Sequence, residues 1–250
     1  MVKSPKEDLF LEGQGVTKYF GGLAAVCDVS FHIRPGEILG LIGPNGAGKT
    51  TLFNLIAGVY RLDRGTISFR GQDIGGLPPN VICKLGIART FQIPKPFLEM
   101  TAIENALVGA FFGHQQKRHM EEARERALGA LKRVGLVGKA EKRVKSLNLV
   151  ERKRLEVARA LSTAPELLLL DEVVAGLNPK EALEMSDFIR SLCKEGITIL
   201  MIEHVMRAIM GLSDRLLVLH YGKKLTEGTP AEVAQNSEVI EAYLGGIKHS

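Results

Sequence analysis

The stretch GPNGAGKT, from Gly43 to Thr50, has the residue types and spacing that hold the phosphates of a nucleotide. It matches the pattern G-x-x-x-x-G-K-[ST], follows an apolar segment expected to be a strand, and opens a segment expected to be a helix. Glycines allow the backbone to curl, so that successive N–H groups converge on phosphate oxygens. The alternative is a tight glycine turn with an incidental lysine, which the position between strand and helix disfavours. We therefore expect this chain to bind a nucleoside triphosphate.

Two side chains of this phosphate-binding loop have separate expected roles. The Lys49 ammonium is expected to reach the β- and γ-phosphates, and the Thr50 hydroxyl is expected to bind Mg²⁺. The residues expected to contact the nucleotide here are Gly43, Pro44, Asn45, Gly46, Ala47, Gly48, Lys49, Thr50 and Thr51.

Two acidic residues follow a second apolar segment, in LLLLDE. Asp171 and Glu172 stand at the C-terminal end of this expected strand, where ligands bind in open α/β sheets. Asp171 is expected to hold Mg²⁺, directly or through water, and Glu172 to take a proton from the attacking water. A positioned base of this kind contributes about 10²–10⁴-fold to a rate. The alternative is a surface acidic pair at a strand end, which is disfavoured because the phosphate-binding loop supplies a reason for the acidic residues.

A histidine ends a third apolar segment, ITILMI, which is followed by Glu203 and His204. A single histidine is usually structural or merely exposed. Here it follows a strand expected to neighbour the strand of Asp171, so we expect His204 to contact the γ-phosphate.

The pattern of apolar residues predicts an α/β core interrupted by helices. Segments apolar throughout are typical of parallel strands that are covered on both faces. The helical spacing of Ala123, Ala127, Ala130, Leu131 and Val134 lies within a region, 101–161, that reads as helical. The segments read as strands are 9–16, 24–33, 37–43, 65–74, 166–170, 197–202 and 215–220, and further helices are expected from Lys49 and over 180–194.

Composition is that of a folded globular protein: of 250 residues, 45% are hydrophobic and 24% charged. This length suits one large domain, or a core with a smaller lobe. The net charge of +5 is modest, and its densest clusters, 139–145 and 152–154, read best as solvated helix faces. No apolar run approaches the length of roughly 18 residues that is needed to cross a bilayer, and the N-terminus has no apolar segment that resembles a signal peptide. Three dispersed cysteines favour a reducing compartment, by default the cytoplasm.

In order along the chain, the phosphate-binding loop, RTFQ, LLLLDE, AGLNP and IEH resemble the ATP-binding subunit of an ABC transporter over nearly the whole sequence. The resemblance implies that ATP and Mg²⁺ are the cofactors and that ATP hydrolysis is coupled to transport. It implies that Gln92 approaches Mg²⁺ and the attacking water. It also implies that Phe20 stacks on adenine, unless this ring is a core aromatic. We expect catalysis to rest on Lys49, Gln92, Glu172 and His204.

The fold that this resemblance implies is α/β: a P-loop NTPase core of the ABC ATPase type with a mixed or parallel sheet, an antiparallel β subdomain and an inserted helical subdomain. One ABC ATPase domain is expected over 8–250. Its nucleotide-binding core would comprise 1–96 and 161–250, and its helical subdomain 97–160.

Two longer stretches resemble the ATPases of branched-chain amino acid importers. They are GIARTFQIPKPFLEMTAIENALVGA, around Gln92, and EGTPAEVAQNSEVIEAYLGG, near the C-terminus. Importers of amides or urea, and exporters of lipid or lipopolysaccharide, share much of this pattern and remain alternatives. A low-turnover nucleotide-sensing module is a further alternative. An ABC ATPase acting on nucleic acid is disfavoured, because the chain has neither a second ATPase domain nor a heptad run.

The loop before the last predicted helix of the lobe departs from the family pattern. This signature loop, residues 147–151, usually reads Leu-Ser-Gly-Gly-Gln or close to it, and here reads LNLVE. Asn148 is expected to cap the helix and to contact the ATP of a partner subunit, with Glu151 folded back as in a capping box. Val150 hinders the close approach that glycine allows, and an unpaired Glu151 would repel phosphate. Val173, Asn178 and Val205 also stand where the family often has Pro, Asp and Asp.

These departures predict an asymmetric assembly. The chain would pair with a second ABC ATPase subunit, a heterodimer being favoured over a homodimer, and its own signature loop would complete a weakly hydrolysing site. The resemblance further implies permease subunits that dock on the segment IPKPFLEMTAIEN after Gln92. A substrate-binding protein would act indirectly, and no nucleic acid is expected. The expected location is cytoplasmic, peripheral on the inner face of the membrane.

Overall fold

The structure, a computed structural model, describes residues 9–244. The extreme ends of the predicted domain, residue 8 and residues 245–250, lie outside that range. The strands are β1 Leu11–Phe20, β2 Leu23–Ile33, β3 Ile38–Ile42, β4 Arg64–Phe69, β5 Gln72–Asp73, β6 Ile87–Arg89, β7 Leu167–Asp171, β8 Thr198–Ile202, β9 Arg215–His220 and β10 Lys223–Gly228. The α-helices are α1 Lys49–Ile56, α2 Pro79–Leu85, α3 Ala102–Phe112, α4 Met120–Arg133, α5 Leu149–Ser162, α6 Pro179–Lys194, α7 Met206–Leu212, α8 Pro230–Gln235 and α9 Ser237–Leu244.

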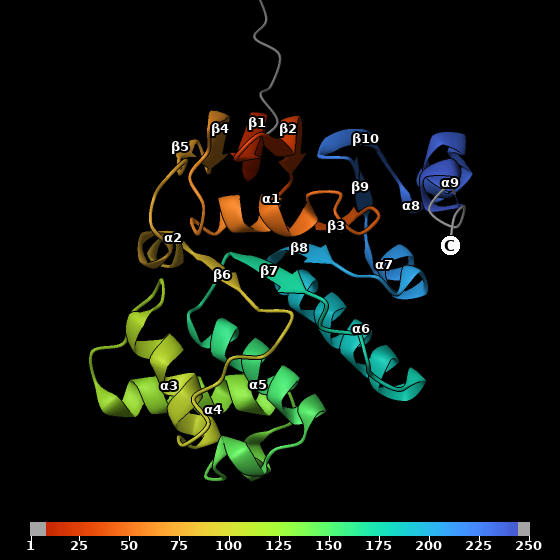
Figure 1. The fold of residues 1–250 in the computed structure, drawn as a ribbon. Helices are drawn as coiled ribbons and strands as arrows, with labels where there is room; N and C mark the ends of the chain where they lie inside the picture. Colours follow the sequence, from red (N-terminus) through yellow and green to blue (C-terminus); the bar gives the residue numbers. More distant parts are fainter. Residues whose placement is uncertain (1–8, 245–250) are drawn as a thin grey trace, which may run out of the picture.

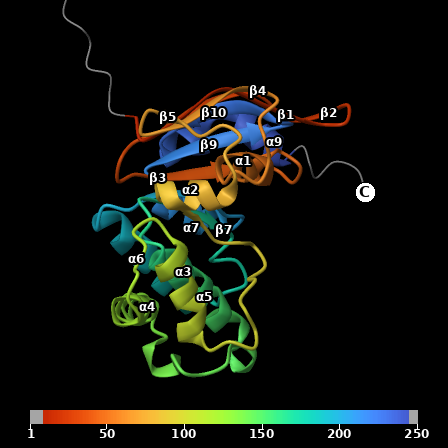
Figure 2. The same ribbon diagram turned by 90° about the vertical axis from the view of Figure 1, so that its left-hand side faces the viewer.

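Two sheets form the core, as the sequence predicted. The larger sheet has the order β10-β9-β3-β8-β7-β6, in which all neighbours from β9 to β6 are parallel and β10 is antiparallel. The smaller sheet, β2-β1-β4-β5, is antiparallel. Helix α1 lies between the two sheets (Figures 1 and 2). The strand β8 does lie beside β7, so the loops carrying His204 and Glu172 leave the same edge of the sheet.

The central strands are apolar throughout because both of their faces are covered. Side chains alternate across a strand. In β7, Leu168 and Leu170 join the cluster that includes the helices α5 and α6, whereas Leu167 and Leu169 join the cluster around α1 and the smaller sheet. The expectation of parallel strands buried on both faces is confirmed.

The region read as helical, 101–161, forms three α-helices. Helices α3, α4 and α5 pack together below the larger sheet, with two short 3-10 turns between α4 and α5 (Figure 1). The predicted helical spacing is confirmed, and Ala123, Ala127, Ala130 and Leu131 are all buried on α4.

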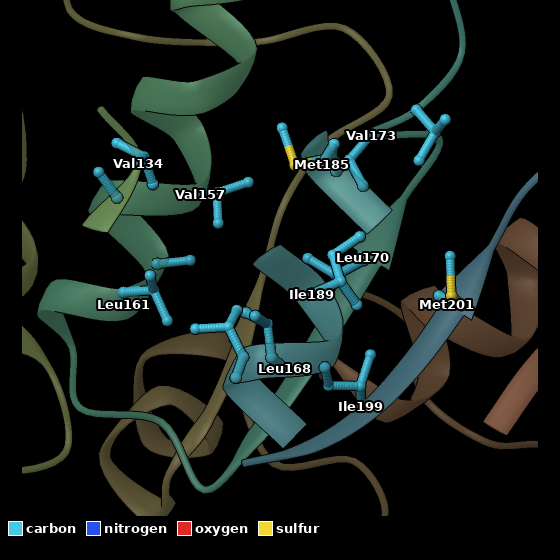
Figure 3. Packing of buried hydrophobic residues seen from close by; sticks show 14 of the residues in the cluster. Val134, Val157, Leu161, Leu168, Leu170, Val173, Met185, Ile189, Ile199 and Met201 are labelled. Carbon is cyan, nitrogen blue, oxygen red and sulfur yellow. The ribbon is translucent and has the colours of Figure 1, made fainter. Parts of the chain in front are cut away.

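Helix α5 joins this helical group to the sheet. Figure 3 shows Val157 and Leu161 of α5 beside Leu168 of β7 and Ile189 of α6, all in one continuous buried cluster. In the described part of the chain, no helix is both long and apolar enough to pass through a bilayer.

Candidate functional site

The phosphate-binding loop lies between β3 and α1, and its glycines have two different reasons to be glycine. A Cβ at Gly43 would lie 2.1 Å from the Leu219 carbonyl oxygen, and one at Gly48 would lie 2.4 Å from the Ala25 carbonyl oxygen. Gly46 has open space around it, but its φ of +78° favours glycine. The loop is thus held closely between β2 and β9, with its backbone curled as the sequence predicted.

Lys49, the first residue of α1, is buried beneath this loop. Its ammonium donates to the carbonyl oxygens of Gly43 at 2.7 Å and Pro44 at 2.9 Å. Burial lowers the pKa of Lys49, while the carboxylates of Glu172 and Asp171 oppose that change. The cation therefore lies at the loop, with acidic groups nearby.

A cavity of about 570 Å³ opens beside the loop and brings most of the predicted residues together. Its lining includes the loop residues Asn45 to Thr51 together with Gln92, Glu172 and His204. These residues come from four separate segments of the chain, spread between positions 45 and 204. The remaining lining residues are Leu23, Ala24, Ala25, Ile202 and Tyr221.

The Glu172 carboxylate is held from both sides. His204 Nε2 lies 2.8 Å from one of its oxygens, and the Gln92 side-chain amide donates to the other at 3.0 Å. Glu172 has a φ of +51°, a left-handed conformation that is uncommon for a residue with a side chain and that clusters at functional sites. The arrangement fixes a carboxylate in the lining of the cavity that the phosphate-binding loop also lines, where it can accept a proton from water.

Asp171 lies one residue earlier, at the end of β7, and is paired with Arg89. The two side chains are buried, with 3.1 Å between Arg89 Nη2 and the Asp171 carboxylate. The same guanidinium bonds to Asn54 of α1 and lies over the rings of Phe53 and Phe91. Burial raises the pKa of Asp171, and the hydrogen bond from Arg89 opposes this.

The residues proposed for Mg²⁺ have suitable chemistry. Thr50, Gln92 and Asp171 all offer oxygen atoms, and Mg²⁺ prefers one or two carboxylates together with waters and phosphate oxygens. The described residues contain no cluster of three or more His, Cys, Asp or Glu side chains that could hold a metal ion. The donor set therefore fits Mg²⁺, with the Asp171 carboxylate shared with Arg89.

Phe20 and Asn148 lie away from this cavity. Phe20 ends β1, is 44% exposed, and meets the ring of Tyr60 edge-on with 5.1 Å between ring centroids. It is not among the residues that line the cavity, whereas Tyr221, which the sequence reasoning missed, is. Asn148 lies in the helical region, at the N-cap of α5, and its contact with a partner's ATP stays a prediction.

The signature loop ends in the predicted capping box. Asn148 accepts the Glu151 backbone N–H at 2.9 Å, and Glu151 accepts the Asn148 N–H at 3.2 Å. Glu151 also pairs with Lys139, and the hydrogen bond from this lysine holds the pKa of the Glu151 carboxyl below its usual range. The carboxylate is folded back and neutralised, so it does not project freely from the helix start.

Sequence reasoning missed Arg89 and the role of Glu203. Arg89 stands in RTFQ, where only Gln92 was singled out. Glu203 precedes His204 and is 2% exposed. Its carboxylate accepts the Val174 N–H at 2.6 Å, and burial raises its pKa to about 7. A charged residue directly after a buried strand was the available signal.

Two family profiles match the chain. The profile described as ABC transporter covers residues 26–175. The profile described as branched-chain amino acid ATP-binding cassette transporter covers residues 223–249.

Relatives of known name match nearly the full length. The high-affinity branched-chain amino acid transport ATP-binding protein LivG of Salmonella typhi is 46% identical over 92% of this chain and 96% of its own. The lipopolysaccharide export system ATP-binding protein LptB of Acidithiobacillus ferridurans is 37% identical over 94% of this chain and 96% of its own. A solved structure, the ADP conformation of an ATP-binding cassette of an ABC transporter, has a TM-score of 0.87 at 33% identity, covering 95% of this chain and 99% of that one.

Proposed function

This chain belongs to the ABC transporter ATP-binding family, and from that premise we propose that it hydrolyses Mg-ATP to drive the import of branched-chain or related amino acids. Its class is established by the family: it is an ATPase in an energy-coupling role. The amino acid substrate, Mg²⁺ and the roles of individual residues are the proposal.

The observation that carries the proposed mechanism is the position of the Glu172 carboxylate. His204 and Gln92 hold it at the wall of the cavity that the phosphate-binding loop also lines. In the proposed reaction, Glu172 takes a proton from the attacking water, and Gln92 and His204 orient that water and contact the γ-phosphate. Transfer of a phosphoryl group depends on such positioning and on charge neutralisation.

Charge neutralisation is assigned to Lys49 and the metal. Lys49 would exchange its bonds to the loop carbonyls for bonds to the β- and γ-phosphates. Mg²⁺, held by Thr50, Asp171 and Gln92, would neutralise charge on the same phosphates. The base of the nucleotide would lie towards Phe20, with the loop residues Gly43 to Thr51 around the phosphates.

The proposed substrate class follows from the relatives. The profile over 223–249 and the 46% identity to LivG both favour branched-chain amino acids. Export of lipopolysaccharide is the second candidate, because LptB is 37% identical over a similar length. The higher identity and the C-terminal profile favour import.

The proposed partners are a second ABC ATPase subunit and transmembrane permeases, with a substrate-binding protein acting through the permeases. Support for a permease surface comes from apolar side chains that are exposed after β6: Phe91, Ile93, Phe97 and Leu98. Such an exposed apolar patch is typical of an interaction site. We place the protein in the cytoplasm, on the inner face of the membrane, as one ABC ATPase domain with a helical subdomain over 97–160.

Reconstituted transport tests this proposal. The chain would be assembled in proteoliposomes with its permeases and partner ATPase. Uptake of labelled leucine would be measured with Mg-ATP supplied on the side of the membrane that carries the ATPase subunits. Glu172→Gln should retain ATP binding and lose at least about 100-fold in ATPase rate, the lower range for a positioned base. ATPase activity without leucine uptake, together with lipopolysaccharide release, would favour the second candidate. A Glu172→Gln complex with unchanged ATPase rate would overturn the proposed mechanism.

A further inference from the structure

Lys153, on α5, makes a connection between two parts of the molecule that serve different nucleotides in the proposed assembly. Its ammonium donates to the carbonyl oxygen of Glu172 at 3.0 Å and also to the carbonyl oxygen of Ala175. Both acceptors belong to the short turn that carries the catalytic glutamate. A lysine side chain of the helical region thus holds the backbone of the catalytic turn at two points.

The turn 172–175 depends on a small number of polar contacts. The Glu172 N–H donates to the Ile202 carbonyl oxygen of β8 at 2.9 Å, and the Val174 N–H donates to Glu203 at 2.6 Å. Glu172 itself has the left-handed φ of +51°, which persists only where the surroundings over-determine it. Lys153 supplies the contacts from the α5 side, so its loss would free the turn to relax.

Burial of the Lys153 ammonium indicates a built contact rather than an incidental surface one. The side chain is half-buried, and this burial lowers its pKa, while the carboxylates of Glu203 and Glu172 oppose that change. An ammonium removed from water needs hydrogen-bond acceptors, which the two carbonyl oxygens provide.

The other end of the connection is the signature loop. Lys153 is four residues after Leu149, the first residue of α5, so it lies about 6 Å along the helix axis from that residue and within two residues of Glu151 of the capping box. Farther along α5, Val157 and Leu161 pack in the same buried cluster as Leu168 of β7 (Figure 3). A displacement of the helix start therefore reaches the catalytic turn through a rigid helix.

We propose that Lys153 is a positioning residue that couples the signature loop of this chain, at the partner's nucleotide, to Glu172, at its own nucleotide. This inference rests on the proposed function, in which each ATP lies between two subunits. When the signature loop closes on the partner's ATP, α5 moves and Lys153 carries the turn with it. Glu172 then reaches its working position only when both nucleotides are in place.

The test uses the assembled transporter with Lys153→Met, Lys153→Arg and the control Lys132→Met. Lys132 is an exposed lysine on α4, so the control removes the same charge from the same residue type. ATP affinity would be measured by calorimetry on the nucleotide-free chain, and kcat, KM and the Hill coefficient for ATP would be measured on the complex.

Lys153→Met should lower kcat by about tenfold or more, because a misplaced base loses part of its typical contribution. It should leave the calorimetric Kd for ATP within twofold (roughly the spread of a neutral surface change) and lower the Hill coefficient. Lys153→Arg should restore most of kcat, since a guanidinium can donate to both carbonyls. Lys132→Met should match the unaltered complex.

Three results would overturn the inference: an unchanged kcat in Lys153→Met, an unchanged Hill coefficient, or a failure of Lys153→Arg to recover kcat. Should Lys153→Met fail to fold, the arginine variant alone decides, because the proposal requires it to be active and cooperative. Glu172→Gln in the same complex distinguishes a failure of the coupling proposal from a failure of the proposed function. If Glu172→Gln abolishes ATPase activity and Lys153→Met does not affect it, only the coupling is wrong; if Glu172→Gln has no effect, the proposed function fails first.

Discussion

Glu203 makes the stability of the folded chain depend on pH in a direction set by its burial. The side chain is 2% exposed, one oxygen accepts the Val174 N–H, and the other accepts no hydrogen bond from the part of the chain that the structure describes. Burial, opposed by the Val174 hydrogen bond and the nearby charge of Lys153, raises the pKa of Glu203 from 4.5 to about 7. The charge of Glu172 adds to the rise.

Between pH 4.5 and about pH 7, the folded chain therefore binds more protons at Glu203 than the unfolded chain does. Its free energy of unfolding must fall as pH rises through this window, and the loss is complete once pH exceeds the folded pKa. At about 1.4 kcal/mol per pKa unit, the whole contribution is on the order of 3 kcal/mol. From about pH 6 to about pH 8.5, the part that can be measured is about 1.4 kcal/mol.

Glu203→Gln tests this reasoning, because the amide oxygen keeps the bond from Val174 and the titrating proton is removed. Urea unfolding followed by circular dichroism would compare the two proteins at both pH values. The unaltered chain should lose about 1.4 kcal/mol more than the variant on going to the higher pH. Glu125→Gln, on the exposed face of α4, is the matched control and should run parallel to the unaltered chain. Parallel curves for Glu203→Gln, or a steeper fall in that variant, would refute the reasoning.

Two further predictions concern the paired sites. Glu172→Gln and the matching change in the partner ATPase should each reduce ATP hydrolysis by the assembled complex, but by different factors. The larger loss, about 10²-fold or more, should come from Glu172→Gln. Equal losses would contradict the asymmetric assembly. Lys139 and the Asn148 N–H already satisfy Glu151. Glu151→Gln should therefore keep the capping box and shift the unfolding free energy by no more than about 1 kcal/mol. It should change the ATPase rate by less than about fivefold, because about 1 kcal/mol corresponds to a factor of roughly five. A tenfold rise would mean that the carboxylate repels the partner's phosphate.

Much of the core could be predicted because local pattern and tertiary environment agree there. The apolar segments of β3, β7 and β8 are buried on both faces, and this fixes them as parallel neighbours. That arrangement, in turn, brings Glu172 and His204 to one edge. The glycine pattern of the phosphate-binding loop likewise specifies a conformation that neighbouring residues reinforce.

The rest depended on side chains whose partners are distant in sequence. Arg89 pairs with Asp171 across 82 positions, and no local pattern identifies that partner. Lys153 lies in a basic run that reads as a solvated face. Its ammonium is nevertheless half-buried, because it donates to the carbonyl oxygens of Glu172 and Ala175. Phe20 was selected for its ring alone, while its position against Tyr60 is set by the packing of β1 beside the loop after α1. The assignment of Phe20 to adenine stays a prediction.

The close fit of the phosphate-binding loop between β2 and β9 also constrains how the chain can change. A Cβ at Gly43 or Gly48 would meet the backbone of Leu219 or Ala25 respectively, and these two residues belong to different sheets. At each position the obstacle is a backbone carbonyl oxygen, which cannot rotate out of the way as a flexible side chain can. The loop thus fits against both sheets. A larger residue at either glycine would require the loop or the adjacent strand to shift, even without bound nucleotide.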